Sequence, residues 1–172
     1  MKKSVHFEVL QSHHDRQGFN CGNPVLDRFL HVNARQNADR NVGVTHIAVR
    51  NEGDSQVLAY YTLVTRAVKS EIVPSKKLPT GDVGVVLLGR LAVDIKAQGM
   101  RLGKLCLTRA IIQVAQAADE IGLYALVLDA IDERARAWYL SLDFGFKPFL
   151  DDPNHLFLTV ETIRQCINNR SD

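Results

Sequence analysis

Residues 87–103, LLGRLAVDIKAQGMRLG, decide the fold. The apolar run 85–93 predicts a strand, and Gly89 inside it suggests a bulge or a splay. After the turn that follows, apolar residues recur at helical spacing, and Gly122 provides the end of a helix. The residues of this stripe are Leu107, Ile111, Val114, Ala118 and Ile121. A short apolar run, 123–128, predicts a buried second strand, so we expect one strand–helix–strand unit over 85–128.

The segments before this unit carry signals for a helix and a hairpin. Asn23 is a typical N-cap and Pro24 suits the first helical position, so we expect a helix over 24–38. Alternating residues predict strands over 44–50 and 57–64, joined through a turn-rich segment as an antiparallel hairpin. Residues 74–84 predict an exposed loop.

The segments after the unit complete an α/β fold. Asp132 can cap a short helix that carries Ala135 and Tyr139 on one face. Residues 144–149 and 156–160 predict a terminal pair of strands. We therefore expect a mixed, mostly antiparallel sheet around the central strand–helix–strand unit.

Length and composition indicate one globular domain over 1–172. The chain is 46% hydrophobic and 23% charged with a net charge of +2, which excludes a disordered segment and a strongly basic nucleic-acid coat. No apolar run could span a membrane and the N-terminus lacks the apolar region of a signal peptide, so we expect a cytoplasmic protein. The three cysteines, Cys21, Cys106 and Cys166, are widely spaced and suit free thiols.

The turn 98–103, QGMRLG, is the candidate ligand site. It lies between a strand and the start of a helix, where free backbone N–H groups and the helix dipole attract a phosphate. The turn lacks the residues of a P-loop and of a dinucleotide fingerprint. An ordinary strand–turn–helix connection remains the alternative at this point.

The motifs LLGRLAVD, QGMRLG, D-x2-A-x3-Y and GF, in this order, resemble the acetyl-CoA-dependent N-acetyltransferases of the GNAT superfamily. The resemblance implies that the turn holds the CoA pyrophosphate, that the preceding strand receives the pantetheine arm, and that Tyr139 protonates the leaving thiolate. The cofactor-binding residues implied in this way are Leu91, Ala92, Val93, Gln98, Gly99, Met100, Arg101, Leu102, Gly103, Asp132 and Ala135. Periodicity alone favours a core role for Tyr139, because it shares the apolar face of Ala135 and Leu142.

Three residues depart from the family pattern. Arg101 stands where the family has Gly, and we expect it to keep a negative φ, because a positive φ would cost about 1–2 kcal/mol. Asp132 stands where many members have Asn, which removes one amide donor to the cofactor. Tyr139 precedes Gly145 by two residues more than usual, and we expect the extra residues to lengthen the loop after the helix.

A wider set of motifs, L-x3-HDR-x2-F-x-CG-x3-LD-x-FL from Leu10 to Leu30, YYTL at 60–63 and GF-x-P at 145–148, looks like the GNAT toxins of bacterial toxin–antitoxin pairs. This resemblance implies acetylation of the α-amine of aminoacyl-tRNA, a ribbon-helix-helix antitoxin as partner, and a homodimer. The rival functions are an acetyltransferase for a small amine or a protein N-terminus, and a degenerate acyl-CoA-binding module.

Basic residues gather around the turn, which suits a polyanionic cofactor and an RNA substrate. The segment from position 90 to position 109 contains five basic residues and one acidic residue, Asp94. We expect Arg90, with Arg35 and Arg40 of the first helix, to contact the RNA. Solvated surface charge is the alternative for each of them.

Two further groups could carry chemistry. His13, His14 and Asp15 suggest a metal site or a dyad, but adjacent histidines do not easily face one ion and no further ligand has suitable spacing. We therefore expect them to fix the loop before the first helix, and we expect no metal. Cys21 is expected to be a buried thiol rather than a nucleophile.

Overall fold

The computed structural model describes residues 4–169, which contain a seven-stranded sheet with the strand order β1-β2-β3-β4-β5-β7-β6. By its internal contacts the chain forms two compact units, one of residues 4–64 and 89–110 and one of residues 65–88 and 111–169. Strands β3 (Ala59–Lys69) and β4 (Asp82–Val93) contribute to both units. The single domain predicted over 1–172 stays a prediction, and its first and last three residues lie outside the described part.

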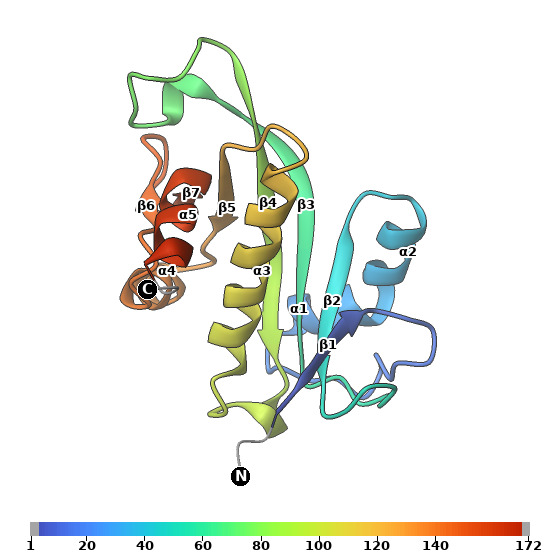
Figure 1. The fold of residues 1–172 in the computed structure, drawn as a ribbon. Coiled ribbons are helices and arrows are strands. Elements are labelled where there is room, and N and C mark those ends of the chain that lie inside the picture. The colour runs from blue at the N-terminus through green and yellow to red at the C-terminus, as the bar shows by residue number, and fades with distance from the viewer. Residues whose placement is uncertain (1–3, 170–172) are drawn as a thin grey trace. The chain divides into compact units, whose positions relative to one another are not determined.

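The first unit is built on antiparallel pairing. β1 (His6–Val9) pairs with β2 (Val44–Val49), and β2 pairs with the first half of β3 from Val44↔Leu63 to Ala48↔Ala59. The hairpin predicted from the sequence is therefore confirmed, although β3 extends further than expected. Figure 1 shows α2 beside β2. The core between them buries Phe29, Leu30, Ile47 and Tyr60, among others.

The helix predicted over 24–38 is confirmed, but its middle turn is wider than an α-helix. It consists of α1 (Pro24–Arg28), a π-helical turn η1 (Phe29–Asn33) and α2 (Ala34–Asp39). The side chain of Asn23 accepts hydrogen bonds from the backbone N–H groups of Val25 and Leu26, as expected of an N-cap. π-Helical turns inside α-helices occur mostly at functional sites.

The second unit contains the parallel strand pair of the predicted strand–helix–strand crossing. The first half of β4 runs parallel to β5 (Ala125–Asp129), with Val85 opposite Ala125, and β5 pairs antiparallel with β7 (His155–Thr159). β6 (Lys147–Pro148) pairs with β7, as the terminal strand pair requires. The unit also holds α4 (Glu133–Ser141), η2 (Ser70–Ile72) and α5 (Val160–Asn168), which lies beside β7 (Figure 1).

The structure corrects the helix after the turn and adds two elements. α3 (Leu102–Ala118) ends before Ile121, whose side chain is 56% exposed and not part of the buried stripe. The chain leaves the helix because the N–H of Asp119 and that of Glu120 reach back only three residues instead of four. β1 and α5 were not predicted. Among residues 4–169, no helix combines the length and apolarity that crossing a membrane requires.

Candidate active site

The turn before α3 is held by hydrogen bonds that the side chains of Asp94 and Gln98 make. The buried Asp94 caps the short 3-10 turn η3 (Ile95–Ala97) by accepting the N–H of Lys96 at 2.8 Å, and its other oxygen accepts the N–H of Asn20 at 3.0 Å. The amide of Gln98 donates to the carbonyl oxygens of Val93 and Cys21 at 3.1 and 3.2 Å. The side chain of Gln98 therefore ties the turn to the end of β4 and to the segment that contains Cys21.

The turn itself uses two residues in the left-handed region. Gly99 has φ 83°, a conformation that suits glycine, and nothing lies within 4 Å of where its Cβ would be. Arg101 has φ 60°, so the expectation of a negative φ was wrong. The geometry of the turn requires the left-handed conformation at the position where the family has Gly, and Arg101 bears a cost of about 1–2 kcal/mol.

The first turn of α3 leaves backbone N–H groups without acceptors inside the helix. The N–H of Leu105 donates to the carbonyl of Arg101 at 3.2 Å, so the N–H groups of residues 102–104 come before this first intrahelical bond. No acidic residue stands in the first turn, and the side chains of Arg101 and Lys104 are exposed. Leu102 is buried and anchors the helix start. The arrangement suits an anion such as a pyrophosphate.

The end of β4 precedes this turn. Ala92 is buried in the core of the first unit, while Leu91 and Val93 are half-buried. The strand ends where the N–H of Asp94 donates to the carbonyl of Leu58 at 2.9 Å. The three residues therefore form a rigid edge leading to the turn.

In the second unit, Asp132 and Ala135 are joined by a hydrogen bond. Asp132 is the N-cap of α4, and its carboxylate accepts the N–H of Ala135 at 2.7 Å. Glu133 adds a second acid to the first turn. The cap predicted from the sequence is confirmed, and this helix start is already supplied with negative charge.

Tyr139 lies on α4 in aromatic surroundings. Its ring packs edge-on against Trp138 at 4.9 Å and Phe146 at 6.1 Å between centroids. Burial raises the pKa of its phenol to about 12, so the group keeps its proton at physiological pH. The helix ends at Ser141, and Asp143 and Gly145 turn the chain with positive φ values. That the two extra residues lengthen this loop relative to the family stays a prediction.

The three arginines predicted to contact RNA all belong to the first unit. Arg90 is half-buried, with its guanidinium carbon 3.9 Å from the centroid of the Phe29 ring, a cation–π contact. Arg35 is half-buried on α2, and Arg40 is exposed at the end of that helix. Arg90 therefore has a packing role besides its charge.

Comparison with known proteins decides the family. No protein-family profile matches the chain. A tRNA-acetylating toxin from Mycobacterium tuberculosis is 36% identical over 158 residues, which are 90% of this chain and 92% of the relative. The chain belongs to the family of tRNA-acetylating toxins.

Solved structures of toxins agree with this assignment. The toxin AtaT in complex with acetyl-methionyl-tRNAfMet is 30% identical, with a TM-score of 0.87 and coverage of 95% of this chain and 99% of that chain. A tyrosine-to-phenylalanine mutant of AtaT, bound to the C-terminus of the antitoxin AtaR and to acetyl-CoA, is 28% identical with a TM-score of 0.80, covering 95% and 98% of the two chains. The GNAT fold expected from the sequence is confirmed.

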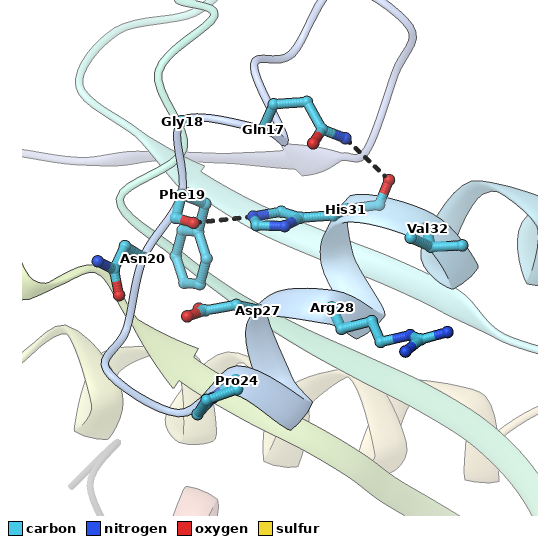
Figure 2. Close-up of a pocket in the computed structure, with 9 residues that line it drawn as sticks. All are labelled: Gln17, Gly18, Phe19, Asn20, Pro24, Asp27, Arg28, His31 and Val32. Atoms are coloured by element: carbon cyan, nitrogen blue, oxygen red, sulfur yellow. Dashed lines mark hydrogen bonds between the residues drawn. The ribbon is translucent and has the colours of Figure 1, made fainter.

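Besides the residues expected from the family, the first unit has a shallow pocket that the sequence did not reveal (Figure 2). Its volume is about 680 Å³. His31 lies in the π-helical turn, and its ring contacts the carbonyl oxygen of Phe19 at 2.9 Å (Figure 2). The pocket is lined by Gln17, Gly18, Phe19, Asn20, Pro24, Asp27, Arg28, His31 and Val32. The π-helical turn, which apolar spacing does not reveal, helps to shape it.

Cys21, next to this pocket, is an inert thiol. Burial, followed by the hydrogen bond with Asp27, raises its pKa to about 11. The thiol therefore stays protonated at physiological pH and is a poor nucleophile, but Cys21 is only half-buried, whereas the sequence predicted a buried thiol.

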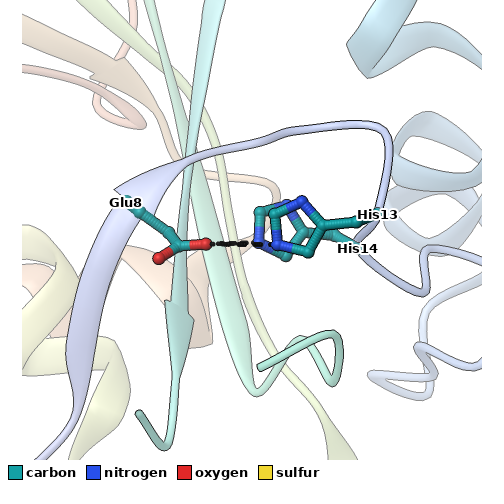
Figure 3. A group of neighbouring side chains, drawn as sticks. All are labelled: Glu8, His13 and His14. Carbon is teal, nitrogen blue, oxygen red and sulfur yellow. Dashed lines mark hydrogen bonds and ion pairs between the residues drawn. The ribbon is translucent and has the colours of Figure 1, made fainter. Parts of the chain in front are cut away.

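The histidine pair is placed differently from the expectation. The rings of His13 and His14 lie 3.9 Å apart, and both face the carboxylate of Glu8 (Figure 3). The premise that no further ligand is available was therefore wrong, because Glu8 is brought there by β1. Asp15 does not join the group, since its side chain accepts the N–H of Gly18 at 3.0 Å.

Proposed function

We propose that this chain transfers the acetyl group of acetyl-CoA to the α-amine of an aminoacyl-tRNA and thereby blocks translation. The observation that carries the proposal is the open start of α3, in a chain that belongs to the tRNA-acetylating toxins. A helix start with free N–H groups and no acid is what a cofactor pyrophosphate requires. The related toxin AtaT has been solved with acetyl-CoA, which is the donor we assign here.

The cofactor would be held by the backbone more than by side chains. Residues 99–103 would supply N–H groups to the pyrophosphate, and residues 91–93 would offer backbone groups to the pantetheine arm. Gln98 would act by fixing the turn, because its amide already bonds two carbonyl oxygens. Asp132 and Ala135 would act by fixing the start of the helix that carries Tyr139.

In the chemical step the neutral amine attacks the thioester carbonyl, the C–N bond forms, and the C–S bond breaks to release the CoA thiolate. Tyr139 would donate a hydrogen bond to this thiolate. With a pKa of about 12, its phenol is a weaker acid than a thiol, so complete proton transfer is uphill by roughly 3 pKa units. The proton that the attacking nitrogen loses would therefore complete the thiol, while Tyr139 stabilises the developing charge.

The acceptor and the partners follow from the family. Arg35, Arg40 and Arg90 would contact tRNA phosphates, and a ribbon-helix-helix antitoxin would neutralise the enzyme. We further propose that the protein acts as a homodimer in the cytoplasm. The related toxin AtaT has been solved both with acetyl-methionyl-tRNAfMet and with the C-terminus of its antitoxin AtaR.

The decisive experiment is mass analysis of the aminoacyl-tRNA pool after in vitro translation with and without acetyl-CoA. We expect acetylated aminoacyl-tRNA only when acetyl-CoA is present. The Michaelis constant for tRNA should rise steeply with salt, because binding to phosphates releases counterions. The double variant Arg35→Glu/Arg40→Glu should weaken the use of tRNA and leave acetyl-CoA affinity unchanged.

The double variant Lys76→Glu/Lys77→Glu provides a matched charge reversal, because both lysines are exposed and belong to the other unit. It should have a much smaller effect on tRNA use. Turnover of small amines without acetylation of any aminoacyl-tRNA would instead support the small-amine enzyme. Acetyl-CoA binding with no turnover of any amine would support the degenerate binding module.

A further inference from the structure

Three donor side chains of the first unit converge on one point. Glu8 comes from β1, and His13 and His14 come from the loop that follows it (Figure 3). The Nε2 atom of His14 lies 2.5 Å from Oε1 of Glu8, and that of His13 lies 3.7 Å from the same oxygen. One ligand atom from each of the three residues lies within 4.8 Å of the others. A carboxylate oxygen and two imidazole nitrogens are ligands that zinc prefers.

The cluster has a buried floor and an open side. The side chain of His14 has no exposed surface, that of Glu8 is 19% exposed, and that of His13 is 49% exposed. An ion could therefore enter past His13 and meet two ligands held by the core. Partial burial also strengthens the attraction between a cation and the Glu8 carboxylate.

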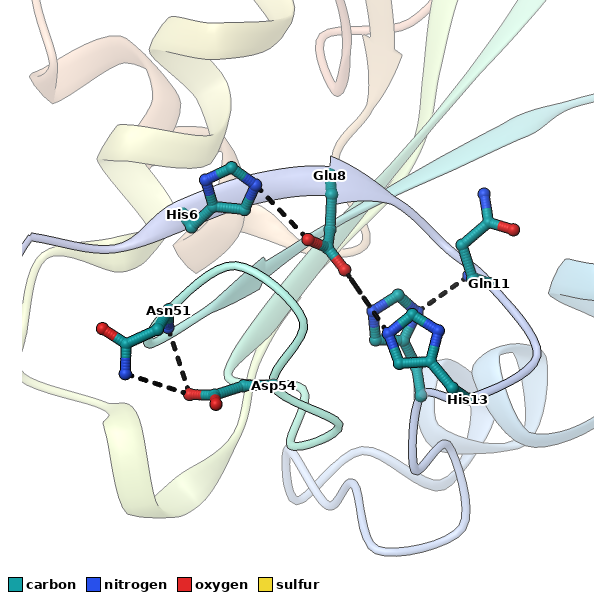
Figure 4. A network of polar contacts seen from close by, with 7 residues as sticks. His6, Glu8, Gln11, His13, Asn51 and Asp54 are labelled. Carbon is teal, nitrogen blue, oxygen red and sulfur yellow. Dashed lines mark hydrogen bonds and ion pairs between the residues drawn. The ribbon is translucent and has the colours of Figure 1, made fainter.

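Simple loop anchoring accounts for only part of the cluster. The N–H of Gln11 donates to Nδ1 of His14 at 2.8 Å, so the ring proton of a neutral His14 is on Nε2 and points at Glu8 (Figure 4). This chain of bonds fixes the loop without His13. His13 nevertheless turns its Nε2 to the same oxygen, and His6 approaches the other oxygen of Glu8 at 3.3 Å.

We propose that Glu8, His13 and His14 bind one divalent transition-metal ion of the zinc class, with water completing the coordination. The ion would lock the loop between β1 and α1 and would take no part in acetyl transfer. Tetrahedral ligands at about 2.0–2.1 Å from zinc lie roughly 3.4 Å apart, so the separations of 2.5 and 3.7 Å need to change by less than about 1 Å.

Binding requires a proton to move within His14. When Nε2 takes the metal, its proton goes to Nδ1, which can then no longer accept the N–H of Gln11. Metal binding is thus coupled to a local change at Gln11.

The test is calorimetric titration of the chelator-treated full chain with Zn²⁺. We expect one equivalent to bind with a dissociation constant of about 10 µM or tighter. Glu8→Gln and His13→Ala should each weaken binding at least about 10-fold, since the loss of even an outer-shell partner has effects of that size. Glu120→Gln is the matched control for Glu8→Gln, because Glu120 is exposed and lies outside the cluster, and it should keep the affinity within about 3-fold.

A second measurement covers the case in which Glu8→Gln fails to fold. Zn²⁺ should shift the amide resonance of Gln11 in the unmodified chain and leave it in place in His13→Ala, whose substituted side chain is half-exposed. No binding, binding that His13→Ala does not weaken, or an equal loss in Glu120→Gln would each overturn the proposal.

Discussion

Helices α3 and α4 each begin after a turn that leads out of a strand, but they differ in what satisfies the free N–H groups of the first turn. At α4 the protein satisfies the helix start itself, because the Asp132 carboxylate caps it and Glu133 adds negative charge. At α3 the first turn holds no acid, and basic Lys104 and Arg101 stand beside open N–H groups. One helix start is thus capped by the protein's own side chain, and the other is left open for an anion.

The difference also separates binding from chemistry. The open helix start carries the groups that we assign to the cofactor, whereas the capped helix carries Tyr139. A capped start makes α4 a stable support, and an open start lets α3 bind. Changes at the two helices should therefore alter different measured quantities.

The largest expected effect is on the capped helix. Tyr139→Phe keeps the ring between Trp138 and Phe146 and removes the hydroxyl that would stabilise the thiolate, so turnover should fall about 10²–10³-fold. Acetyl-CoA affinity and thermal stability should hold. Tyr124→Phe makes the same chemical change at a residue outside the proposed site and is the control. Near-normal turnover of Tyr139→Phe would mean that Tyr139 serves only to pack the helix.

The next effect concerns the open helix. Gly103→Glu gives α3 the acid that α4 already has and places it against the cofactor phosphates. Like charges in contact cost several kcal/mol, so acetyl-CoA should bind at least about 100-fold more weakly by calorimetry. Gln116→Glu, exposed near the other end of α3, controls for the added charge. Unchanged affinity in Gly103→Glu would remove the pyrophosphate site from this helix.

A smaller effect is expected from the strained residue of the open turn. Arg101→Gly removes the backbone strain of an arginine in the left-handed region and should raise the free energy of unfolding by about 1 kcal/mol. Met100→Gly is the matched control, because Met100 has no positive φ and should lose stability instead. Denaturant unfolding measures both variants, and a loss of stability in Arg101→Gly would contradict the strain.

The cap of the other helix should have an effect of similar or smaller size. Asp132→Ala removes the acceptor of the Ala135 N–H and should lower the free energy of unfolding by about 1 kcal/mol. Asp132→Ser retains a capping oxygen and should recover most of this loss. If Ala and Ser behave alike, the cap is not what stabilises α4.

The smallest expected effect is on the pH dependence of turnover, which should show no decline at moderately alkaline pH. Only the protonated phenol can donate to the thiolate, so activity is lost as the pH rises through the pKa of Tyr139. Because burial raises this pKa to about 12, the pH–rate profile should stay level up to pH ~10.5, whereas an ordinary tyrosine of pKa ~10 would have lost half its activity at pH ~10. A decline centred at pH ~10 would mean that Tyr139 is not buried during catalysis.

Short-range signals in the sequence determined most of the fold. Asn23, Pro24 and Asp132 act within a few residues of themselves, so their caps could be recognised without the structure. Apolar periodicity determined the strand–helix–strand unit for the same reason. The end of α3 was missed because Ile121 continues the apolar spacing after the backbone has left the helix.

Only the tertiary structure decided the features that depend on distant contacts. The sequence motif located the turn at 98–103 but not the positive φ of Arg101. That conformation belongs to a turn held by hydrogen bonds to Asn20 and Cys21, which lie more than 70 positions away in the sequence. Glu8 meets His13 and His14 only because β1 pairs with β2 and directs its side chain to that loop. Spacing along the chain specifies local hydrogen bonds, whereas convergence of side chains from separate elements depends on how those elements pack.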